Sequence, residues 1–296
     1  MTELLTTDEA AAYLRLSERK LYELVARAAV PCTKVTGRWL FPRAALDRWV
    51  MAGLITPAAL AHPAAPPIVG GSHDPLLEWA LRESGCGLAY LPEGSGEGLR
   101  RLIQGEVIAA AIHLHALDAA DDEQANLSAV AAAAGLHDAV VIAFARREQG
   151  IVTAAGNPHG VTDIVSLAGG SVQVAQRPAA AGAQLLLLAL LRRAGVTPDR
   201  LTFARPVCPT GTDIAQAIRS GRADCGIATR SVAAIAGLDF LPLIWERFDL
   251  VLRQRDYFLP GPQALFAFLR SPVLAERAIE LGGYDVRSVG EVRLLN

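Results

Sequence analysis

The chain has 296 residues, of which 52% are hydrophobic and 20% charged, and its formal net charge is −2. A chain of this length can bury a substantial core and predicts two or three compact units. No apolar run reaches the roughly 18 residues that a membrane span requires. The N-terminus lacks the basic-then-apolar order of a secretory signal. We therefore expect a cytoplasmic protein with no membrane partner.

The first fifty residues carry a local excess of positive charge. Between positions 15 and 48, eight basic residues stand against three acidic ones, in a chain whose remainder is acidic. A basic cluster on an otherwise acidic protein is the electrostatic footprint of a nucleic-acid-binding module.

Short elements follow one another closely in this basic segment. Thr6 or Thr7 can cap a helix that runs through about residue 14, and Ser17 can cap a second helix with apolar residues at helical spacing. So tight a junction between two amphipathic helices is typical of a helix-turn-helix. The run "CTKVTGRWLF" then predicts a hairpin around Thr36-Gly37, and Pro42 begins a third helix.

The order "TTDEAAAYLRLSERKLYELV", a proline, and "KVTGRWLFPRAALDRWV" resembles the excisionase and MerR-like winged helix-turn-helix family over residues 3–51. In this arrangement the start of the second helix reaches base edges and the wing grips the backbone or minor groove. Trp39 is either a wing contact or a core residue. Half-sites usually pair, so we expect a homodimer on double-stranded DNA. The expected DNA contacts are Ser17, Arg19, Lys20 and Tyr22 on the helix, and Lys34 and Arg38 on the hairpin.

A Pro- and Ala-rich stretch, "LITPAALAHPAAPPIVGG", follows this module and has the composition of a stiff spacer. We place a linker at 54–67, between a DNA-binding domain at 1–53 and a second domain at 68–296. In the second domain the apolar runs "PPIVGG", "GLAYL", "VIAAAIHL", "AVVIAFA", "SVQVAQ", "CGIAT" and "LDFLPLI" alternate with helical stretches. This alternation predicts an α/β fold with parallel sheets, which bind ligands at the carboxyl ends of their strands.

Several loops at those strand ends share one chemistry. The loops "VGGSHD", "PEGSGEGL", "QRPAAAGAQ" and "CPTGTDIAQAI" bring small or hydroxylic residues to the start of a helix. Helix starts offer free N–H groups to an anion, and Arg177 is one of few cations among these loops. In the first loop a purely structural alternative stays open, with Asp74 as the helix cap and Pro75 in the first turn. The recurrence of the pattern favours an anion site.

The histidines of "HLH", His113 and His115, would lie on the same side of a strand, a geometry that could hold a metal. The sequence offers no third ligand near them, and the four scattered cysteines form no Cys-x-x-Cys pair. We therefore expect no metal and no cofactor, and we place His113 at a strand end near the ligand.

The stretches "GSHDPLLEWAL", "GSGEGLRRLIQGEVIAAAIHLHALD", "REQGIVTAAGNPHGVTDIVSLAGG", "AIRSGRADCGIA" and "GLDFLPLIWERFDLV" extend along nearly the whole second domain. In order and spacing they resemble the type II periplasmic-binding-protein-like domains related to molybdate-binding proteins, some of which are fused to a helix-turn-helix. The resemblance implies two lobes joined by a hinge, lobe one at about 68–140 and 250–296 and lobe two at about 141–249. The chain would cross between them near "VVIAFARREQG" and return near "ERFDLVL".

The resemblance also implies where a small anion, molybdate or tungstate, would bind. Ser72 and Ser95 match the two hydroxyl-bearing loops of lobe one. In lobe two, the family usually shows Asn-Arg-Gln and then Gly-Ser-Gly-Thr-Arg, whereas this chain has Arg177 displaced by about one position and "AAAGAQ" in place of the hydroxyls. Only backbone N–H groups are left in that loop. The expected ligand-binding residues are Ser72, His73, Ser95, Gly96, His113, Arg177, Ala180, Ala181 and Thr210.

These observations predict a transcription regulator that senses molybdate or tungstate and is not an enzyme. Two alternatives stay open. The same architecture could sense a small organic acid or an amino-acid-like ligand, which the missing hydroxyls favour. The two-lobed fold could also belong to an enzyme, although an enzyme would not need the basic N-terminal module.

Overall fold

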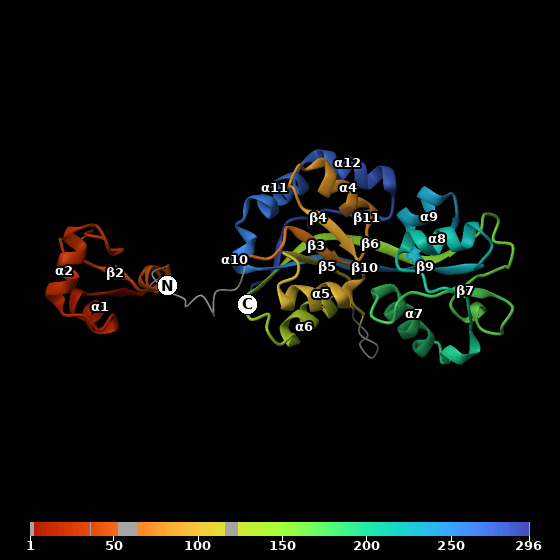
Figure 1. Ribbon diagram of the computed structural model, residues 1–296, viewed down its shortest axis with the longest axis horizontal. Helices are drawn as coiled ribbons and strands as arrows, with labels where there is room; N and C mark the ends of the chain where they lie inside the picture. The colour runs from red at the N-terminus through yellow and green to blue at the C-terminus, as the bar shows by residue number, and fades with distance from the viewer. Residues whose placement is uncertain (1–2, 36, 53–63, 116–123, 296) are drawn as a thin grey trace. The chain divides into compact units, whose positions relative to one another are not determined.

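The computed structural model describes residues 3–35, 37–52, 64–115 and 124–295. The chain forms two compact units, Met1–His62 and Pro63–Asn296 (Figure 1). Thr36 and most of the expected linker lie outside the described residues. Within the described ranges, every helix is too short or too polar to span a bilayer.

The N-terminal unit is a helix-turn-helix followed by a hairpin. Thr6 caps the first helix in a capping box with Glu9, and Ser17 caps the second by accepting a hydrogen bond from the Lys20 N–H at 3.2 Å. Both caps satisfy N–H groups that have no partner inside the helix. The elements are β1 (Leu4–Leu5), α1 (Thr7–Tyr13), α2 (Glu18–Ala26), β2 (Phe41–Pro42) and α3 (Arg43–Ala52).

The expected hairpin is present, because the backbones of Thr33 and Leu40 exchange hydrogen bonds of 2.8 and 2.9 Å. Trp39 is half-buried and packs against the core of this unit, with the Lys34 ammonium 5.2 Å from its ring centroid. The third helix begins at Arg43, one residue later than predicted, because Pro42 still pairs with β1.

The second unit is built on a mixed sheet with the strand order β4-β3-β5-β10-β6-β9-β7-β8, and β11 and β12 also pair with β6. All seven apolar runs expected as strands form strands. The bounds are β3 (Ile68–Gly71), β4 (Ala89–Pro92), β5 (Ala109–Ile112), β6 (Ala139–Thr153), β7 (Gln173–Ala175), β8 (Thr202–Phe203), β9 (Cys225–Thr229), β10 (Asp239–Arg253), β11 (Tyr284–Asp285) and β12 (Val292–Leu295).

Two long strands join the two halves of this sheet. β6 and β10 pair antiparallel from Ala139 opposite Arg253 to Thr153 opposite Asp239. β5 pairs with β10 near one end, and β9 pairs with β6 near the other. The prediction of parallel sheets is therefore right within each half and wrong in the middle, where the crossing strands run antiparallel to their neighbours. We call the β3–β5 half lobe one and the β7–β9 half lobe two.

Helices cover both faces of each lobe. In lobe one, α4, α11 and α12 lie on one face and α5 and α6 on the other, whereas in lobe two α7 lies opposite α8 and α9 (Figure 1). The bounds are α4 (Pro75–Glu83), α5 (Ser95–Gln104), α6 (Ala125–Ala132), α7 (Gly182–Arg193), α8 (Gly211–Arg219), α9 (Arg230–Ala236), α10 (Gln254–Tyr257), α11 (Pro260–Leu269) and α12 (Pro272–Leu281).

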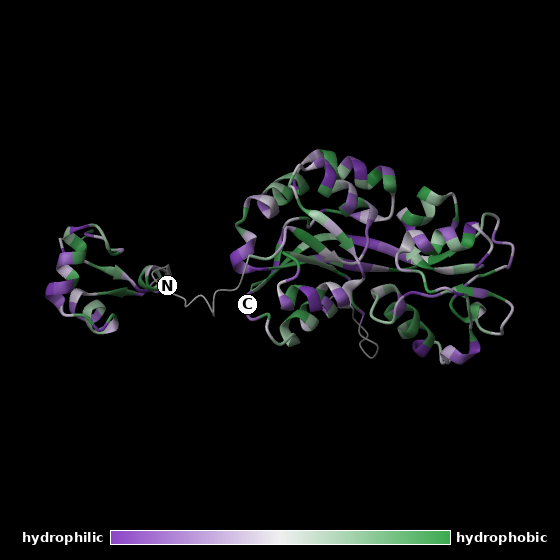
Figure 2. Cartoon of the chain, viewed as in Figure 1, coloured by the Kyte–Doolittle hydropathy of each residue, from purple (hydrophilic) through white to green (hydrophobic). Residues whose placement is uncertain are grey.

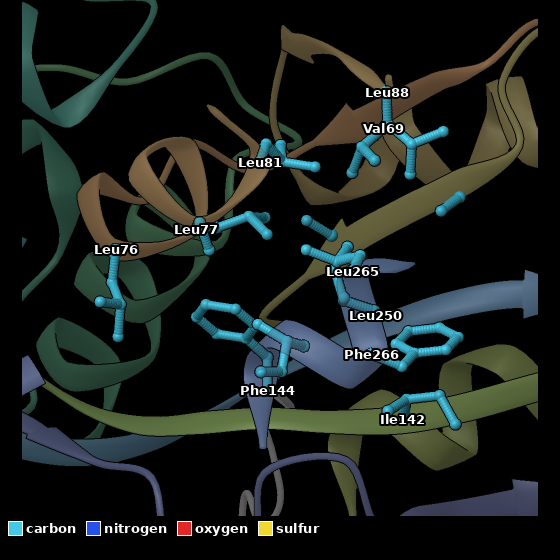
Figure 3. Close-up of a cluster of buried hydrophobic side chains, with 14 of the residues drawn as sticks. Val69, Leu76, Leu77, Leu81, Leu88, Ile142, Phe144, Leu250, Leu265 and Phe266 are labelled. Atoms are coloured by element: carbon cyan, nitrogen blue, oxygen red, sulfur yellow. The ribbon is translucent and has the colours of Figure 1, made fainter. Parts of the chain in front are cut away.

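The largest buried cluster lies under α4. Leu77 from α4, Phe144 from β6, Leu250 from β10 and Leu265 from α11 meet in it, each at most 2% exposed (Figure 3). Each of these side chains contributes about 1.5–3 kcal/mol of transfer free energy when fully buried. This packing fixes α4, and therefore the loop before it, against the crossing strands.

Candidate functional site

The loop before α4 is anchored by Asp74, which is fully buried. One carboxylate oxygen accepts hydrogen bonds from the N–H groups of Leu76 and Leu77 at 2.9 and 3.0 Å, and Pro75 follows in the first turn. The prediction that Asp74 caps this helix, with Pro75 in its first turn, is therefore confirmed. The second oxygen accepts from Arg147 at 3.0 Å and from the Tyr284 hydroxyl at 2.9 Å.

Ser72 and His73 precede this cap. Ser72 is buried, and its carbonyl accepts a hydrogen bond from the Tyr90 hydroxyl at 2.5 Å. Its own hydroxyl makes no hydrogen bond among the described residues, and its assignment as a ligand donor stays a prediction. The His73 ring stacks on Tyr90, with Nε2 3.1 Å from a Glu78 carboxylate oxygen. That arrangement holds His73 to lobe one.

Arg147 lies at the centre of the crossing strands and is 1% exposed. Its guanidinium bridges two buried carboxylates, Asp74 at 3.0 Å and Glu246 at 2.6 Å, and lies 4.0 Å from the Phe248 ring centroid. Arg147 is not among the site residues predicted from the sequence. The sequence does contain a signal for it, the polar run "RREQ" inside a strand that is otherwise buried and apolar. This run is the purple middle of β6 in Figure 2. Charged side chains in such a strand must be paired, so the run indicates buried partners.

Glu246 on β10 lies within hydrogen-bond distance of both histidines of lobe one. The same carboxylate oxygen, Oε2, lies 3.1 Å from His113 Nδ1 and 2.8 Å from His115 Nε2. Its other oxygen accepts hydrogen bonds from Arg147 and from Gln149 at 2.6 and 3.0 Å. The prediction that no third ligand lies near the two histidines is therefore wrong. Glu246 is distant in sequence and reaches them through the pairing of β10 with β5.

Burial decides the protonation of this cluster. It lowers the pKa of His113 to about 4, even though Glu246 opposes the shift, so the ring is neutral near pH 7. Burial alone would raise the pKa of Glu246. Three effects nevertheless hold its pKa well below the usual range: the charge of His113, which is protonated at the low pH where Glu246 titrates, the charge of Arg147, and the hydrogen bonds from both histidines.

Ser95 begins α5 but turns its hydroxyl towards β5. The hydroxyl donates to the His113 carbonyl and accepts from the His113 N–H, both at 3.0 Å. In this arrangement its one hydrogen is in use, so a ligand could receive it only after Ser95 leaves His113. The assignment of Ser95 as a ligand donor stays a prediction.

The starts of α5 and α7 touch one another between the lobes. The Gly96 N–H donates to the Ala180 carbonyl at 3.3 Å. A Cβ on Gly182 would lie 2.0 Å from the His113 carbonyl oxygen, and Ala181 is buried against Gly94. The carbonyl of Ala180 therefore takes the N–H group that an anion at the start of α5 would use.

Arg177 follows β7 and is 8% exposed. One terminal nitrogen donates to the Pro209 carbonyl at 2.7 Å. The Nε atom is buried and has no hydrogen-bond partner among the described residues. No carboxylate of the described residues lies within 4.0 Å of this guanidinium. Burial, followed by the nearby charge of Arg147, lowers its pKa to about 10, although Cys208 and Asp213 oppose the shift. A buried cation without a counter-ion is costly and fits a site for an anion.

Thr210 stands at the start of α8 beside this arginine. Its hydroxyl takes part in a capping box with Asp213, donating to the carboxylate at 2.6 Å and accepting from the Asp213 N–H. A Cβ on Gly211, the first residue of α8, would lie 4.0 Å from an Arg177 nitrogen. The start of α8 thus adjoins Arg177, but the hydroxyl of Thr210 already serves as a cap.

The expected DNA contacts lie on the surface of the N-terminal unit. Arg19 and Lys20 are exposed at the start of α2, in salt bridges of 3.6 and 3.3 Å with Glu23. Tyr22 is 48% exposed, and Lys34 and Arg38 are exposed on the hairpin. Ser17 is exposed but serves as the cap of α2. Helix and hairpin therefore present basic side chains to solvent, as a winged helix-turn-helix does.

Comparison with known proteins places both units. Residues 78–270, more than half of the chain, match the model of the PBP superfamily domain. The chain belongs to the PBP superfamily. Residues 4–53 match a helix-turn-helix domain. The PBP domain is thus joined to a DNA-binding fold, a combination that fits a ligand-responsive transcription regulator.

Several known proteins are similar to this chain at low identity. The protein YvgK of Bacillus subtilis strain 168 is 23% identical over 98% of this chain and 97% of its own. A hydrogen-peroxide-bound mutant of Corynebacterium glutamicum OxyR is 14% identical, with a TM-score of 0.51 over 93% of this chain and 89% of its own. The tungstate ABC transporter of Geobacter sulfurreducens is 15% identical, with a TM-score of 0.52 over 72% of this chain and 97% of its own.

Proposed function

We propose that this protein is a DNA-binding transcription regulator whose PBP domain senses a small anion at Arg177, and that it is not an enzyme. In this account a homodimer acts in the cytoplasm, with Arg19 and Lys20 at the bases and the hairpin on the backbone. The observation that carries the ligand chemistry is the buried, carboxylate-free guanidinium of Arg177.

The groups around Arg177 favour an anion over a neutral ligand. An anion there would restore the charge balance of a guanidinium whose pKa burial lowers to about 10. The N-terminus of α8 adjoins the same guanidinium and supplies positive dipole and N–H groups. Cation and helix start would then hold one negatively charged group together.

We keep molybdate or tungstate as the first ligand, held by Arg177, by backbone N–H groups and by the free hydroxyl of Ser72. A small carboxylic acid or amino-acid-like ligand is the second candidate. It is favoured because Ser95 and Thr210 use their hydroxyls within the protein, and because a planar carboxylate suits a guanidinium fork.

Calorimetric titration of the wild-type protein with molybdate, tungstate and a panel of small carboxylates tests this proposal. A charged hydrogen bond contributes roughly 1.5–3 kcal/mol, so Arg177→Ala should weaken the best ligand by about ten- to a hundredfold. Arg219→Ala, at the exposed far end of α8, is the matched control and should bind as the wild type does. Equal affinity in Arg177→Ala and the wild type would contradict the site.

A further inference from the structure

A second site lies in the cluster of His113, His115 and Glu246. The three ligand atoms, one imidazole nitrogen from each histidine and one carboxylate oxygen, lie within 4.8 Å of one another, and all three residues are buried. In a tetrahedral site with bonds of about 2.0–2.2 Å, such atoms lie roughly 3.5 Å apart. The observed nitrogen–oxygen distances of 2.8 and 3.1 Å are therefore within a small adjustment of that spacing.

We propose that His113, His115 and Glu246 bind a divalent metal ion of the zinc class, through His113 Nδ1, His115 Nε2 and Glu246 Oε2. Two imidazoles and one carboxylate suit Zn²⁺ and the neighbouring transition ions. Three protein ligands leave a further coordination position for a water or an exogenous ligand. This site goes beyond the proposed anion sensing and does not depend on it.

The surroundings of Glu246 match those of a metal-binding carboxylate. Its Oε2 faces the two histidines, whereas Oε1 is fixed by Arg147 and Gln149. Outer hydrogen bonds of this kind orient ligating carboxylates in metal sites. The other side-chain atom of Gln149, Oε1, is buried without a partner among the described residues, and a metal-bound water would satisfy it.

The charges of the cluster also accommodate a cation. Two buried carboxylates, Asp74 and Glu246, stand against one guanidinium, that of Arg147, which leaves one negative charge. A bound divalent ion would change the net charge of this group from negative to positive.

The test is a Co²⁺ titration of full-length protein that has been stripped with a chelator and carries no histidine tag. The wild type should bind one equivalent and develop the visible absorption of a four- or five-coordinate Co²⁺ ion, which one equivalent of Zn²⁺ should displace. Absence of stoichiometric binding by the folded wild type would overturn the proposal whatever the variants do.

Variants locate the ion. His113→Gln and His115→Gln should each weaken Co²⁺ binding by more than about a hundredfold, beyond the 10- to 100-fold expected for outer residues such as Gln149→Leu. His159→Gln is the control, because this exposed histidine pairs with Asp224 outside the cluster. Circular dichroism confirms folding, and Glu246→Gln replaces any histidine variant that fails to fold. Wild-type affinity in the ligand variants would place the ion elsewhere and refute this site.

Discussion

Single buried charges organise the interior of the PBP domain. Arg147 holds Asp74, the cap of α4, and Glu246, the partner of the two histidines, in one hydrogen-bonded group. Charges at this depth cost several kcal/mol to desolvate and are tolerated only when they are paired. The group therefore fixes the loop before α4 relative to both crossing strands.

Replacing Arg147 by methionine should be strongly destabilising. The substitution keeps much of the apolar volume but leaves two buried carboxylates without their cation, so we expect a loss of about 3–5 kcal/mol in the free energy of unfolding. Urea unfolding measures this, with Arg82→Met on the exposed face of α4 as the control. A loss below about 1 kcal/mol would mean that Arg147 is not the counter-ion of this group.

His113 should make stability depend on pH. Its folded pKa of about 4 lies below the ordinary 6.5, so the unfolded chain binds more protons between these values. The stabilisation is complete above pH 6.5 and is lost as the pH falls towards 4, by about 3 kcal/mol at 1.4 kcal/mol per pKa unit. Unfolding at several pH values should show a shallower decline in His113→Gln. Parallel curves for variant and wild type would contradict the assignment.

At the scale of elements, the starts of α5 and α7 form one contact between the lobes. Gly182→Val should separate them, because a Cβ would lie 2.0 Å from the His113 carbonyl oxygen. The Gly96 N–H would then lose the Ala180 carbonyl, and hydrogen exchange over residues 94–99 should become faster. Gly211→Ala, at the equivalent first position of α8, is the control. Unchanged exchange in Gly182→Val would show that the contact does not depend on this close approach.

The start of α2 is the element that we expect to read DNA. Arg19→Ala and Lys20→Ala should each weaken binding to DNA from the protein's own promoter region by about 1–3 kcal/mol, because we place both side chains at base edges. Fluorescence anisotropy at several salt concentrations measures both. Promoter affinity that both variants leave unchanged at every salt concentration would remove α2 as the reading helix.

Local signals in the sequence were enough to predict many of these elements. The caps at Ser17 and Asp74 and the hairpin between Thr33 and Leu40 depend on residues close in the chain. The meeting of Arg147 with Glu246 does not, because 99 residues separate them and the antiparallel register of β6 and β10 brings them together. The hydrogen bond from the Ser95 hydroxyl to the His113 carbonyl likewise depends on how α5 packs against β5.

At the scale of the whole molecule, a PBP domain regulates DNA binding only if its ligand has different affinities for the conformations that the chain can adopt. The coupling free energy in such systems is typically about 1–3 kcal/mol, or about 5- to 150-fold in affinity. Because coupling between two binding events is reciprocal, DNA should also change the affinity for the anion by the same factor. The direction of the change in DNA affinity would distinguish a repressor that the anion releases from DNA from one that the anion recruits to DNA.

The most direct test measures promoter-DNA affinity with and without the best anion from the titration panel, for the wild type and for Arg177→Ala. We predict that the anion changes the dissociation constant of the wild type by at least about fivefold. Arg177→Ala should bind DNA as the wild type does without anion and should lose the response. An anion that binds at Arg177 but leaves the DNA affinity of the wild type unchanged would contradict the account of this protein as a ligand-responsive regulator.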